Sequence, residues 1–251
     1  MKFKDHFSGQ AADYAQFRPR YPEALFRYLS ALAPSRGTAW DCATGNGQAA
    51  VALAAHFERV IATDASGTQI ANAEPHEGVE YRTAPAEQSG IASGSVGLVT
   101  VAQALHWFDI PAFVDEAKRV LQPRGIIACW TYNLLSVTRE IDALVQEFYA
   151  TTTGPFWPPE REIVEAGYQT IDFPFDEVTP PPFQMQTLWT VEQLLGYLRT
   201  WSATQKFIAA RGFDPVSLLG DELREHWQPP ESARLVTWPL SMRVGRVIDQ
   251  S

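Results

Sequence analysis

The sequence predicts an α/β fold in which a mostly parallel sheet is covered by helices on both faces. Short apolar segments alternate with helical segments between residues 38 and 130, an order typical of parallel βαβ units. A glycine-containing turn joins the first predicted strand to the helix after it, and Asp64 ends the second strand. Open sheets of this kind bind ligands at such turns, so the predicted fold already indicates where a site should lie.

The elements of the first half follow from composition and periodicity. Five segments are short and apolar enough to be buried strands: 38–42, 60–63, 79–83, 96–101 and 125–130. Helices are expected at 23–32, 48–56, 67–73 and 111–121. Ser66 is placed to cap the third of these helices.

The second half follows a different pattern, with helices and strands separated by Pro-rich stretches. Helices are expected at 138–149, 191–200, 204–211 and 215–227. A strand is expected at 183–189, and 234–247 is compatible with one long strand or a hairpin. The Pro-rich stretches at 154–159 and 178–182 are typical of loops within one fold, so we expect a single domain over residues 1–251.

Composition and charge argue against several classes of protein. The 251 residues carry a formal net charge of −9 without a large basic cluster, so no nucleic-acid partner is expected. No run approaches the roughly 20 apolar residues of a membrane span, and residues 1–6 lack the apolar run of a signal peptide. The 2 cysteines, Cys42 and Cys129, have neither CxxC nor zinc spacing, which favours a cytoplasmic protein without a metal site. The oligomeric state stays open, and a monomer is compatible with the sequence.

The strongest local signal is the segment 41–47, Asp-Cys-Ala-Thr-Gly-Asn-Gly, which follows an apolar strand and begins a helix. Glycines let the backbone approach a ligand and adopt positive φ, and Asp64 is placed to bind ribose hydroxyls. The GxGxxA spacing that starts at Gly45 fits a dinucleotide fingerprint. Asp41 before the glycines instead favours S-adenosylmethionine (SAM), whose amino group it would hold. A tight turn without a ligand is the third interpretation.

The same segment resembles motif I of class I SAM-dependent methyltransferases of type 11, with Ala43 where the family carries its first glycine. Alanine is expected to fit if this position needs a small side chain and not a positive φ. Asp64 matches the family's ribose-binding acid, and the pair 86–87 matches the one that flanks adenine. Pro85 and Gly97 stand where many relatives carry an acid. The resemblance implies a Rossmann-like class I methyltransferase fold with seven strands, an N-terminal lid and a helical insertion near the C-terminal strands.

Four further segments together look like the trans-aconitate methyltransferase group, which methylates a small carboxylic acid. They are 18–22 (Arg-Pro-Arg-Tyr-Pro), 106–109 (His-Trp-Phe-Asp), 154–157 (Gly-Pro-Phe-Trp) and 197–203 (Tyr-Leu-Arg-Thr-Trp-Ser-Ala). The resemblance implies a small-molecule substrate. It also divides the domain into a lid and first helix in 1–35, a SAM-binding core in 36–133, and acceptor-site helices with the final strands in 134–251.

The resemblance and the predicted sheet together give two sets of site residues. Those expected to bind SAM are Tyr14, Asp41, Thr44, Gly45, Asn46, Gly47, Asp64, Ala65, Ala86, Glu87, Gln103 and Ala104. Those expected to line the acceptor site are Arg18, Tyr21, His106, Trp107, Trp130, Tyr132, Trp157, Trp201 and Ser202. For the aromatic members of the second set, packing in the core or in loops is the alternative role.

Methyl transfer from a sulfonium is an in-line displacement, which needs an aligned nucleophile and the exclusion of water. A carboxylate acceptor is already ionised at pH 7 and needs no general base. Arg18 is then the leading catalytic candidate, because a guanidinium binds a carboxylate through two parallel hydrogen bonds; otherwise it is a solvated surface residue. His106 is the second candidate, either contacting the acceptor or serving as the base for a hydroxyl or amine; otherwise it is structural.

Two other functions stay open on the sequence alone. An NAD-dependent oxidoreductase would suit the GxGxxA spacing, although no Tyr/Lys or His/acid catalytic set is placed convincingly. A non-catalytic SAM-binding protein would account for Ala43, Pro85 and Gly97. The sequence favours a SAM-dependent methyltransferase that acts on a small organic acid.

Overall fold

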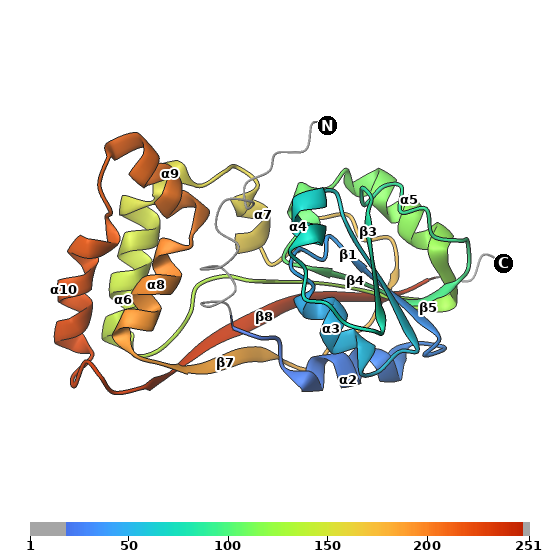
Figure 1. Cartoon of the computed structure of the whole chain (residues 1–251), viewed down its shortest axis with the longest axis horizontal. Coiled ribbons are helices and arrows are strands. Elements are labelled where there is room, and N and C mark those ends of the chain that lie inside the picture. The colour runs from blue at the N-terminus through green and yellow to red at the C-terminus, as the bar shows by residue number, and fades with distance from the viewer. Residues whose placement is uncertain (1–18, 248–251) are drawn as a thin grey trace.

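The structure, a computed structural model, describes residues 19–247, and at its centre lies an eight-stranded sheet (Figure 1). Five parallel strands come first in the chain: β1 (Thr38–Cys42), β2 (Arg59–Asp64), β3 (Val79–Thr83), β4 (Val96–Ala102) and β5 (Leu121–Tyr132). The order across the sheet is β3-β2-β1-β4-β5, followed by β8 and β6. The predicted α/β, Rossmann-like fold is confirmed.

Helices cover both faces of this sheet. One face carries α2 (Glu23–Leu32) and α3 (Gln48–Ala54), the other carries α5 (Ile110–Val120), and α4 (Gly67–Ala71) follows β2. Alternation along each strand builds the two faces. In β5, Ile126 and Ala128 pack in the same cluster as α2 and α3, whereas Ile127 and Cys129 pack in the cluster that contains α5. Ser66 caps α4 as predicted, accepting a hydrogen bond from the backbone of Gln69.

The antiparallel strand β8 (Arg234–Arg246) connects the sheet with the rest of the chain. Its residues 240–246 pair with β5, and its residues 234–239 pair with β7 (Gln184–Trp189). The two-residue strand β6 (Asp176–Glu177) pairs with its last residues. The sequence left a hairpin or one strand open here, and the structure shows one strand. The sheet has eight strands where seven are predicted, because the two-residue strand β6 was not expected from the sequence.

Four helices gather at one end of the molecule, beyond β7 and β8 (Figure 1). They are α6 (Arg139–Glu147), α8 (Val191–Arg199), α9 (Ser202–Arg211) and α10 (Val216–His226), and we call them the helical lobe. Buried side chains such as Val145, Leu198 and Leu223 pack together there with Trp238 of β8. Each helix predicted for this region is present, with ends displaced by one to a few residues.

Short elements that the sequence did not predict lie close to the carboxyl ends of the strands. The 3₁₀ helix η1 (Leu105–Trp107) follows β4 and contacts α7 (Arg161–Glu165). A π-helix, η2 (Phe148–Thr152), continues α6, and η3 (Gly154–Phe156) begins the predicted Pro-rich loop. Elements of three to five residues carry too little hydrophobic periodicity to be recognised from sequence.

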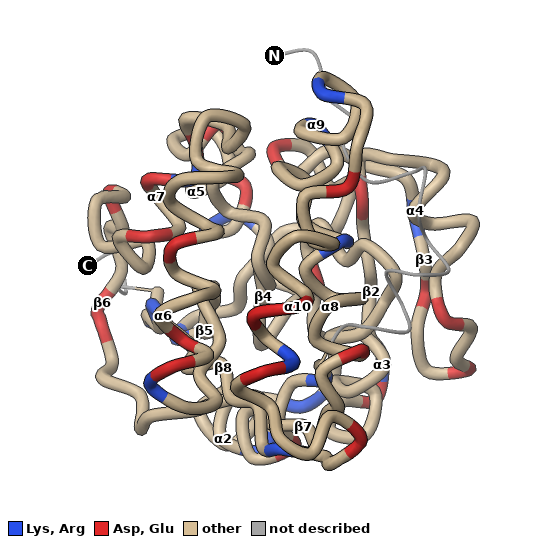
Figure 2. The backbone as a smooth tube through the Cα atoms, turned by 90° about the vertical axis from the view of Figure 1, so that its left-hand side faces the viewer, with Lys and Arg blue, Asp and Glu red and all other residues tan. Residues whose placement is uncertain are grey.

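Two surface properties bear on possible partners. Within residues 19–247, no helix combines the length and the apolar composition that crossing a membrane requires. Acidic and basic positions are interspersed over the elements that face the viewer in Figure 2. On that face, the basic positions therefore do not merge into one continuous patch.

Candidate active site

The turn after β1 is held in a left-handed backbone conformation. The φ angle is +55° at Ala43, +56° at Gly45 and +86° at Gly47. A Cβ added to Gly47 would lie 2.3 Å from the hydroxyl oxygen of Tyr81, so this position requires glycine for space as well as for φ. A Cβ added to Gly45 would meet no described atom within 4 Å. Open space therefore lies in front of Gly45, where a ligand can approach the backbone.

Ala43 does not meet the condition under which alanine was expected to fit, because its φ is +55°. Glycine adopts this left-handed region without strain, whereas an L-residue there costs roughly 1–2 kcal/mol. The loop thus stores strain directly beside the open space at Gly45.

Asp41 lies in β1, directly before this turn, and is almost completely buried. Its two carboxylate oxygens accept hydrogen bonds from the hydroxyl groups of Thr44 (2.6 Å) and Thr100 (2.7 Å). Burial raises the pKa of Asp41 to about 6, against the lowering effect of the two hydroxyl donors. Within residues 19–247 no cation lies within ion-pair distance of this carboxylate.

Asp64 links the turn to the carboxyl end of β2. Its carboxylate accepts hydrogen bonds from the backbone N–H of Gly45 (3.0 Å) and of Ser66 (2.8 Å). The backbone N–H of Thr44 donates to the carbonyl of Thr63 at 2.9 Å, which holds the two strand ends together. Asp64 therefore stands beside the open space at Gly45, where the sequence predicts a ribose-binding acid.

The other residues predicted to bind SAM lie around the same strand ends. The carbonyl of Asn46 accepts a backbone hydrogen bond, and Glu87 accepts one at 3.0 Å from the backbone of the residue that caps α5. Ala65 is exposed, whereas Ala86 and Ala104 are buried. Tyr14 lies outside the described residues.

Gln103 fastens the ends of β4 and β5 together. Its φ is +56°, and its side-chain oxygen accepts hydrogen bonds from the Thr131 hydroxyl and the Tyr132 backbone N–H, both at 2.8 Å. Its side-chain nitrogen donates to the Tyr132 carbonyl at 3.2 Å. The side-chain amide of Gln103 is therefore hydrogen-bonded to β5, and these bonds hold the ends of β4 and β5 together at this edge of the sheet.

His106 lies in η1, directly after β4, in a poorly solvated position. Its Nδ1 is 3.2 Å from the hydroxyl oxygen of Tyr168, and its ring is 4.6 Å from the ring of Trp107. Burial lowers the pKa of His106 to about 3, and the charge of Arg161 acts in the same direction. His106 is therefore neutral at pH 7.

Arg161, at the start of α7, is a site residue that the sequence did not indicate. Its Nε donates to the Tyr149 hydroxyl at 2.7 Å, and its Nη2 donates to the Asn133 side chain at 2.6 Å. Its guanidinium lies over the rings of Trp157 (4.8 Å) and Tyr149 (5.2 Å). No spacing pattern marks this residue, because its hydrogen-bond partners Asn133 and Tyr149 lie 28 and 12 residues away in the chain. The available signal was a cation beside an aromatic, Pro-rich segment.

Aromatic side chains form the wall of this region. The ring of Trp157 lies 5.7 Å from that of Trp201 and 5.1 Å from that of Tyr149. An open cavity of about 450 Å³ adjoins Trp157, and two charged residues, Glu160 and Lys206, are among its lining. It is lined by Trp107, Pro155, Phe156, Trp157, Pro158, Pro159, Glu160 and Lys206. The predicted acceptor residues His106, Trp107, Trp157 and Trp201 are thus brought into one neighbourhood with Arg161.

The remaining predicted acceptor residues are placed differently. Trp130 is 0 % exposed and packs edge-to-face against Tyr21 and Phe26, with ring distances of 5.4 and 6.3 Å. Trp130 and Tyr21 therefore take part in the packing between β5 and α2, and their role in the acceptor site stays a prediction. Ser202 begins α9, next to Trp201. Arg18 lies outside the described residues.

Comparison with known proteins identifies the family. The model for the methyltransferase domain matches residues 40–129. A protein named as a methyltransferase in Dictyostelium discoideum is 37% identical over 226 residues, which cover 88% of this chain and 86% of the relative. The chain belongs to the SAM-dependent class I methyltransferases. It is an enzyme of that family and SAM is its methyl donor, so the oxidoreductase and non-catalytic alternatives are set aside.

A solved structure and a fungal relative agree with this assignment. A structure described as a type II methyltransferase from Anaeromyxobacter dehalogenans has a TM-score of 0.89 and 45% identity, covering 93% of this chain and 100% of that chain. Methyltransferase AacuQ of Aspergillus aculeatus is 33% identical over 145 residues, which are 55% of this chain and 46% of that protein. The narrower resemblance to trans-aconitate methyltransferases stays a prediction, because these relatives are named only as methyltransferases.

Proposed function

We propose that this methyltransferase transfers the methyl group of SAM to a carboxylate oxygen of a small organic acid. The observation that carries the proposal is the protonation state of His106. Burial lowers the pKa of His106 to about 3, and the charge of Arg161 is the second cause. The alternative, methylation of a hydroxyl or amine with His106 as the base, needs a proton acceptor whose pKa lies near the operating pH. His106 is several pH units too weak a base for that role.

A carboxylate removes the need for a base because it is already ionised. SAM, when bound, supplies a methyl group on a positively charged sulfur that keeps the bonding electron pair as the methyl leaves. The products are a methyl ester and S-adenosylhomocysteine, and no proton is taken from the acceptor. The chain's residues therefore have to bind, align and desolvate the two reactants.

The residues around the β1 turn suit the methyl donor. Open space in front of Gly45, the buried carboxylate of Asp41 and the carboxylate of Asp64 at the end of β2 match, in type and order, the donor site that the resemblance implies. In this proposal Asp64 binds the ribose hydroxyls and Asp41 balances the amino group. Trp107, with Trp157, excludes water from the reacting end.

The direct test is a turnover assay with the full chain. SAM is offered with a panel of mono-, di- and tricarboxylic acids that includes trans-aconitate, and with alcohols and amines of similar size. We expect S-adenosylhomocysteine and a methyl ester with one or more acids, and a His106→Gln variant that keeps most of that activity. Turnover confined to alcohols or amines and abolished in His106→Gln would instead establish the alternative.

Binding of the donor is tested separately by calorimetry with SAM and S-adenosylhomocysteine. We expect both to bind, and an Asp64→Ala variant to bind them at least about tenfold more weakly, because hydrogen bonds to a charged group are lost. Equal affinity in Asp64→Ala would remove Asp64 from the donor site while leaving the acceptor proposal intact.

A further inference from the structure

Arg161 stands at the end of the sheet where an acceptor would meet the donor. Its Nη2 is hydrogen-bonded to Asn133, the residue directly after β5, and its charge acts on His106, which follows β4. Ligands of open α/β sheets bind beyond the carboxyl ends of the strands. The guanidinium is therefore placed at the reacting end of the site, although α7 is distant from β4 and β5 in sequence.

The partners of Arg161 are neutral, unlike those of Arg243 and Arg199. Arg243 donates to both carboxylate oxygens of Glu177, at 2.6 and 2.9 Å, and Arg199 donates to Asp214 at 2.7 Å. Within residues 19–247, no carboxylate lies within ion-pair distance of Arg161; the exposed Glu165 is reached through the Tyr149 hydroxyl. Removing a cation from water is costly unless an opposite charge compensates it.

The contacts of Arg161 also hold its guanidinium in one orientation and leave the Nη1 edge available for a ligand. Tyr149 and Asn133 occupy Nε and Nη2, and the rings of Tyr149 and Trp157 lie along its faces. In the described part of the chain, no acceptor is hydrogen-bonded to Nη1. That nitrogen supplies two N–H donors, and an arginine fixed by stacking loses little conformational freedom when it binds an anion.

We propose that Arg161 binds the carboxylate of the methyl acceptor and thereby selects anionic over uncharged acceptors. The identity of the acceptor as an organic acid rests on the proposed function. The anion supplies the negative charge that the protein does not place beside Arg161, and charge-assisted hydrogen bonds to a guanidinium are among the strong ones. The role that the sequence assigns to Arg18 is thus held, within the described residues, by Arg161.

The test compares Arg161→Gln, Arg161→Lys and the matched control Arg234→Gln in the full chain. Arg234 is a matched control because it is also partly buried, lies over a tryptophan ring (Trp227, 5.4 Å) and donates to a neutral partner. It differs in position, because it begins β8 and pairs with β7. Binding of trans-aconitate and of succinate is measured by tryptophan fluorescence with S-adenosylhomocysteine present. The uncharged probe is succinamide. Steady-state KM and kcat are measured with each acid that the wild type methylates.

We expect Arg161→Gln to weaken binding of the bound acid, and to raise its KM, by about 10- to 100-fold. The affinity for S-adenosylhomocysteine should change less than about twofold, because the donor lies over β1 and β2. Arg161→Lys should be intermediate, since it keeps the charge but loses the planar fork. Arg234→Gln should behave as the wild type, and succinamide should bind equally weakly to every variant.

The outcomes separate the two proposals. Acids that are methylated with the same KM by Arg161→Gln and the wild type would overturn the inference and leave the proposed function standing. Acids that bind in an Arg161-dependent manner without being methylated would overturn the proposed function and leave the inference standing. If the wild type neither binds nor methylates any acid, both are wrong. Thermal melting confirms folding of each variant, and Arg161→Lys decides the matter if Arg161→Gln does not fold.

Discussion

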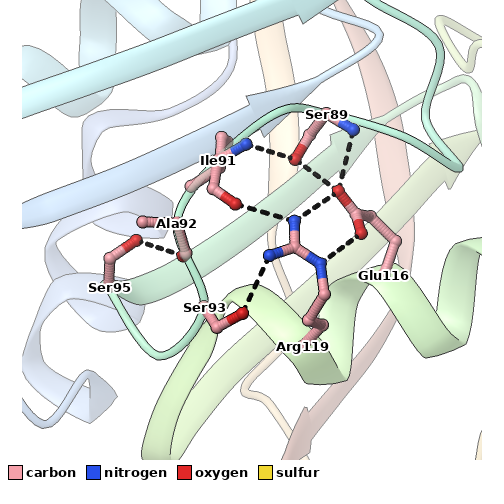
Figure 3. Close-up of polar contacts among 7 residues, drawn as sticks. All are labelled: Ser89, Ile91, Ala92, Ser93, Ser95, Glu116 and Arg119. Carbon is pink, nitrogen blue, oxygen red and sulfur yellow. Dashed lines mark hydrogen bonds and ion pairs between the residues drawn. The ribbon is translucent and has the colours of Figure 1, made fainter.

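Two clusters of ionisable side chains differ in how their charges are balanced. Glu116, although only 8% exposed, accepts hydrogen bonds from Arg119 at 2.7 and 2.8 Å and from Ser89 at 2.6 and 2.8 Å (Figure 3). Arg119 donates further to the Ile91 carbonyl and the Ser93 hydroxyl. At the strand ends, by contrast, Asp41 and Arg161 are hydrogen-bonded within residues 19–247 to neutral groups.

This difference separates structural charges from functional ones. The Glu116–Arg119 cluster fastens the loop before β4 to α5, and every strong donor and acceptor in it is used within the protein (Figure 3). Asp41 accepts from hydroxyl groups, and Arg161 donates to a hydroxyl and an amide. A buried charge that lacks an opposite charge costs stability, so in this site the ligands are the groups expected to complete the balance.

The largest effect on stability is expected from Glu116→Ala. Removing one member of a buried ion pair leaves the other uncompensated, and because Arg119 is partly exposed we expect a loss of about 2 kcal/mol in the free energy of unfolding. The methyl-transfer rate of the folded variant should stay within about twofold of the wild type. Urea denaturation followed by fluorescence measures the first quantity, and the turnover assay measures the second.

The pH dependence of the free energy of unfolding in acid tests the same cluster. Hydrogen bonds from Arg119, and then from Ser89, lower the pKa of Glu116 to about 2 from 4.5. An acid with a lowered folded pKa contributes stability that is present above about pH 4.5 and is lost as the pH falls toward 2. The wild type should therefore lose its advantage over Glu116→Gln in that window. If Glu116→Ala lowered kcat but not stability, the division between structural and functional charges would be wrong.

A smaller effect is expected at Asp41, where the opposite charge would come from the donor's amino group. The folded pKa of about 6 is raised by burial, so the carboxyl group becomes protonated as the pH falls through 6. The affinity for S-adenosylhomocysteine should then decrease from pH 7 to pH 5. In Asp41→Asn the affinity at pH 7 should be about tenfold lower and nearly independent of pH. Calorimetry across this range makes the measurement.

Thr100→Val is the matched control for Asp41. It removes one of the two hydroxyl donors that lower the Asp41 pKa, without changing the charge of the site. The midpoint of the pH dependence should therefore move upward. A pH-independent affinity in the wild type would show that Asp41 only organises the turn.

The sequence predicts the frame of this molecule better than its site, and the reason is the range of the interactions. The helix at 23–32 and the strands at 38–42 and 79–83 have the predicted bounds, because strand length and hydrophobic spacing are local properties. The cap at Ser66 is likewise a local hydrogen bond. The candidate donor site could be predicted from the sequence because one turn and one acid define it.

The candidate acceptor site could be predicted only in part, because tertiary packing brings its residues together. Arg161 owes its surroundings to Asn133 and Tyr149, which are 28 and 12 residues away in the chain. Trp130 has the composition of a pocket residue, but its place on β5 turns it toward α2. Neither placement is visible as a motif, whereas His106, Trp107 and Trp157 could be proposed from the sequence because the family resemblance covers them.

A further effect on the pH dependence of stability is expected at His106. Burial holds its folded pKa near 3, below the ordinary value of 6.5, so the unfolded chain binds one more proton between these values. Stability therefore falls as the pH decreases from about 6.5, by about 1.4 kcal/mol per pH unit at most. His106→Gln should flatten this slope in urea denaturation at pH 7, 6 and 5. An unchanged slope would mean that His106 protonates freely, and it would reopen its role as a base.

The smallest effect is expected from Ala43→Gly, which restores the glycine that the family carries. The residue has a φ of +55°, so glycine removes the strain of an L-side chain in the left-handed region. Glycine also gives the unfolded chain more freedom, which offsets about 0.4–1 kcal/mol of that gain. We expect a net stabilisation of less than about 1 kcal/mol, with unchanged affinity for S-adenosylhomocysteine. Destabilisation would show that the Ala43 methyl group contributes packing worth more than the strain it causes. A large gain in affinity would instead mean that the strain at Ala43 opposes donor binding. The turn, like the carboxylate of Asp41 beside it, would then reach its most stable state only with a ligand present.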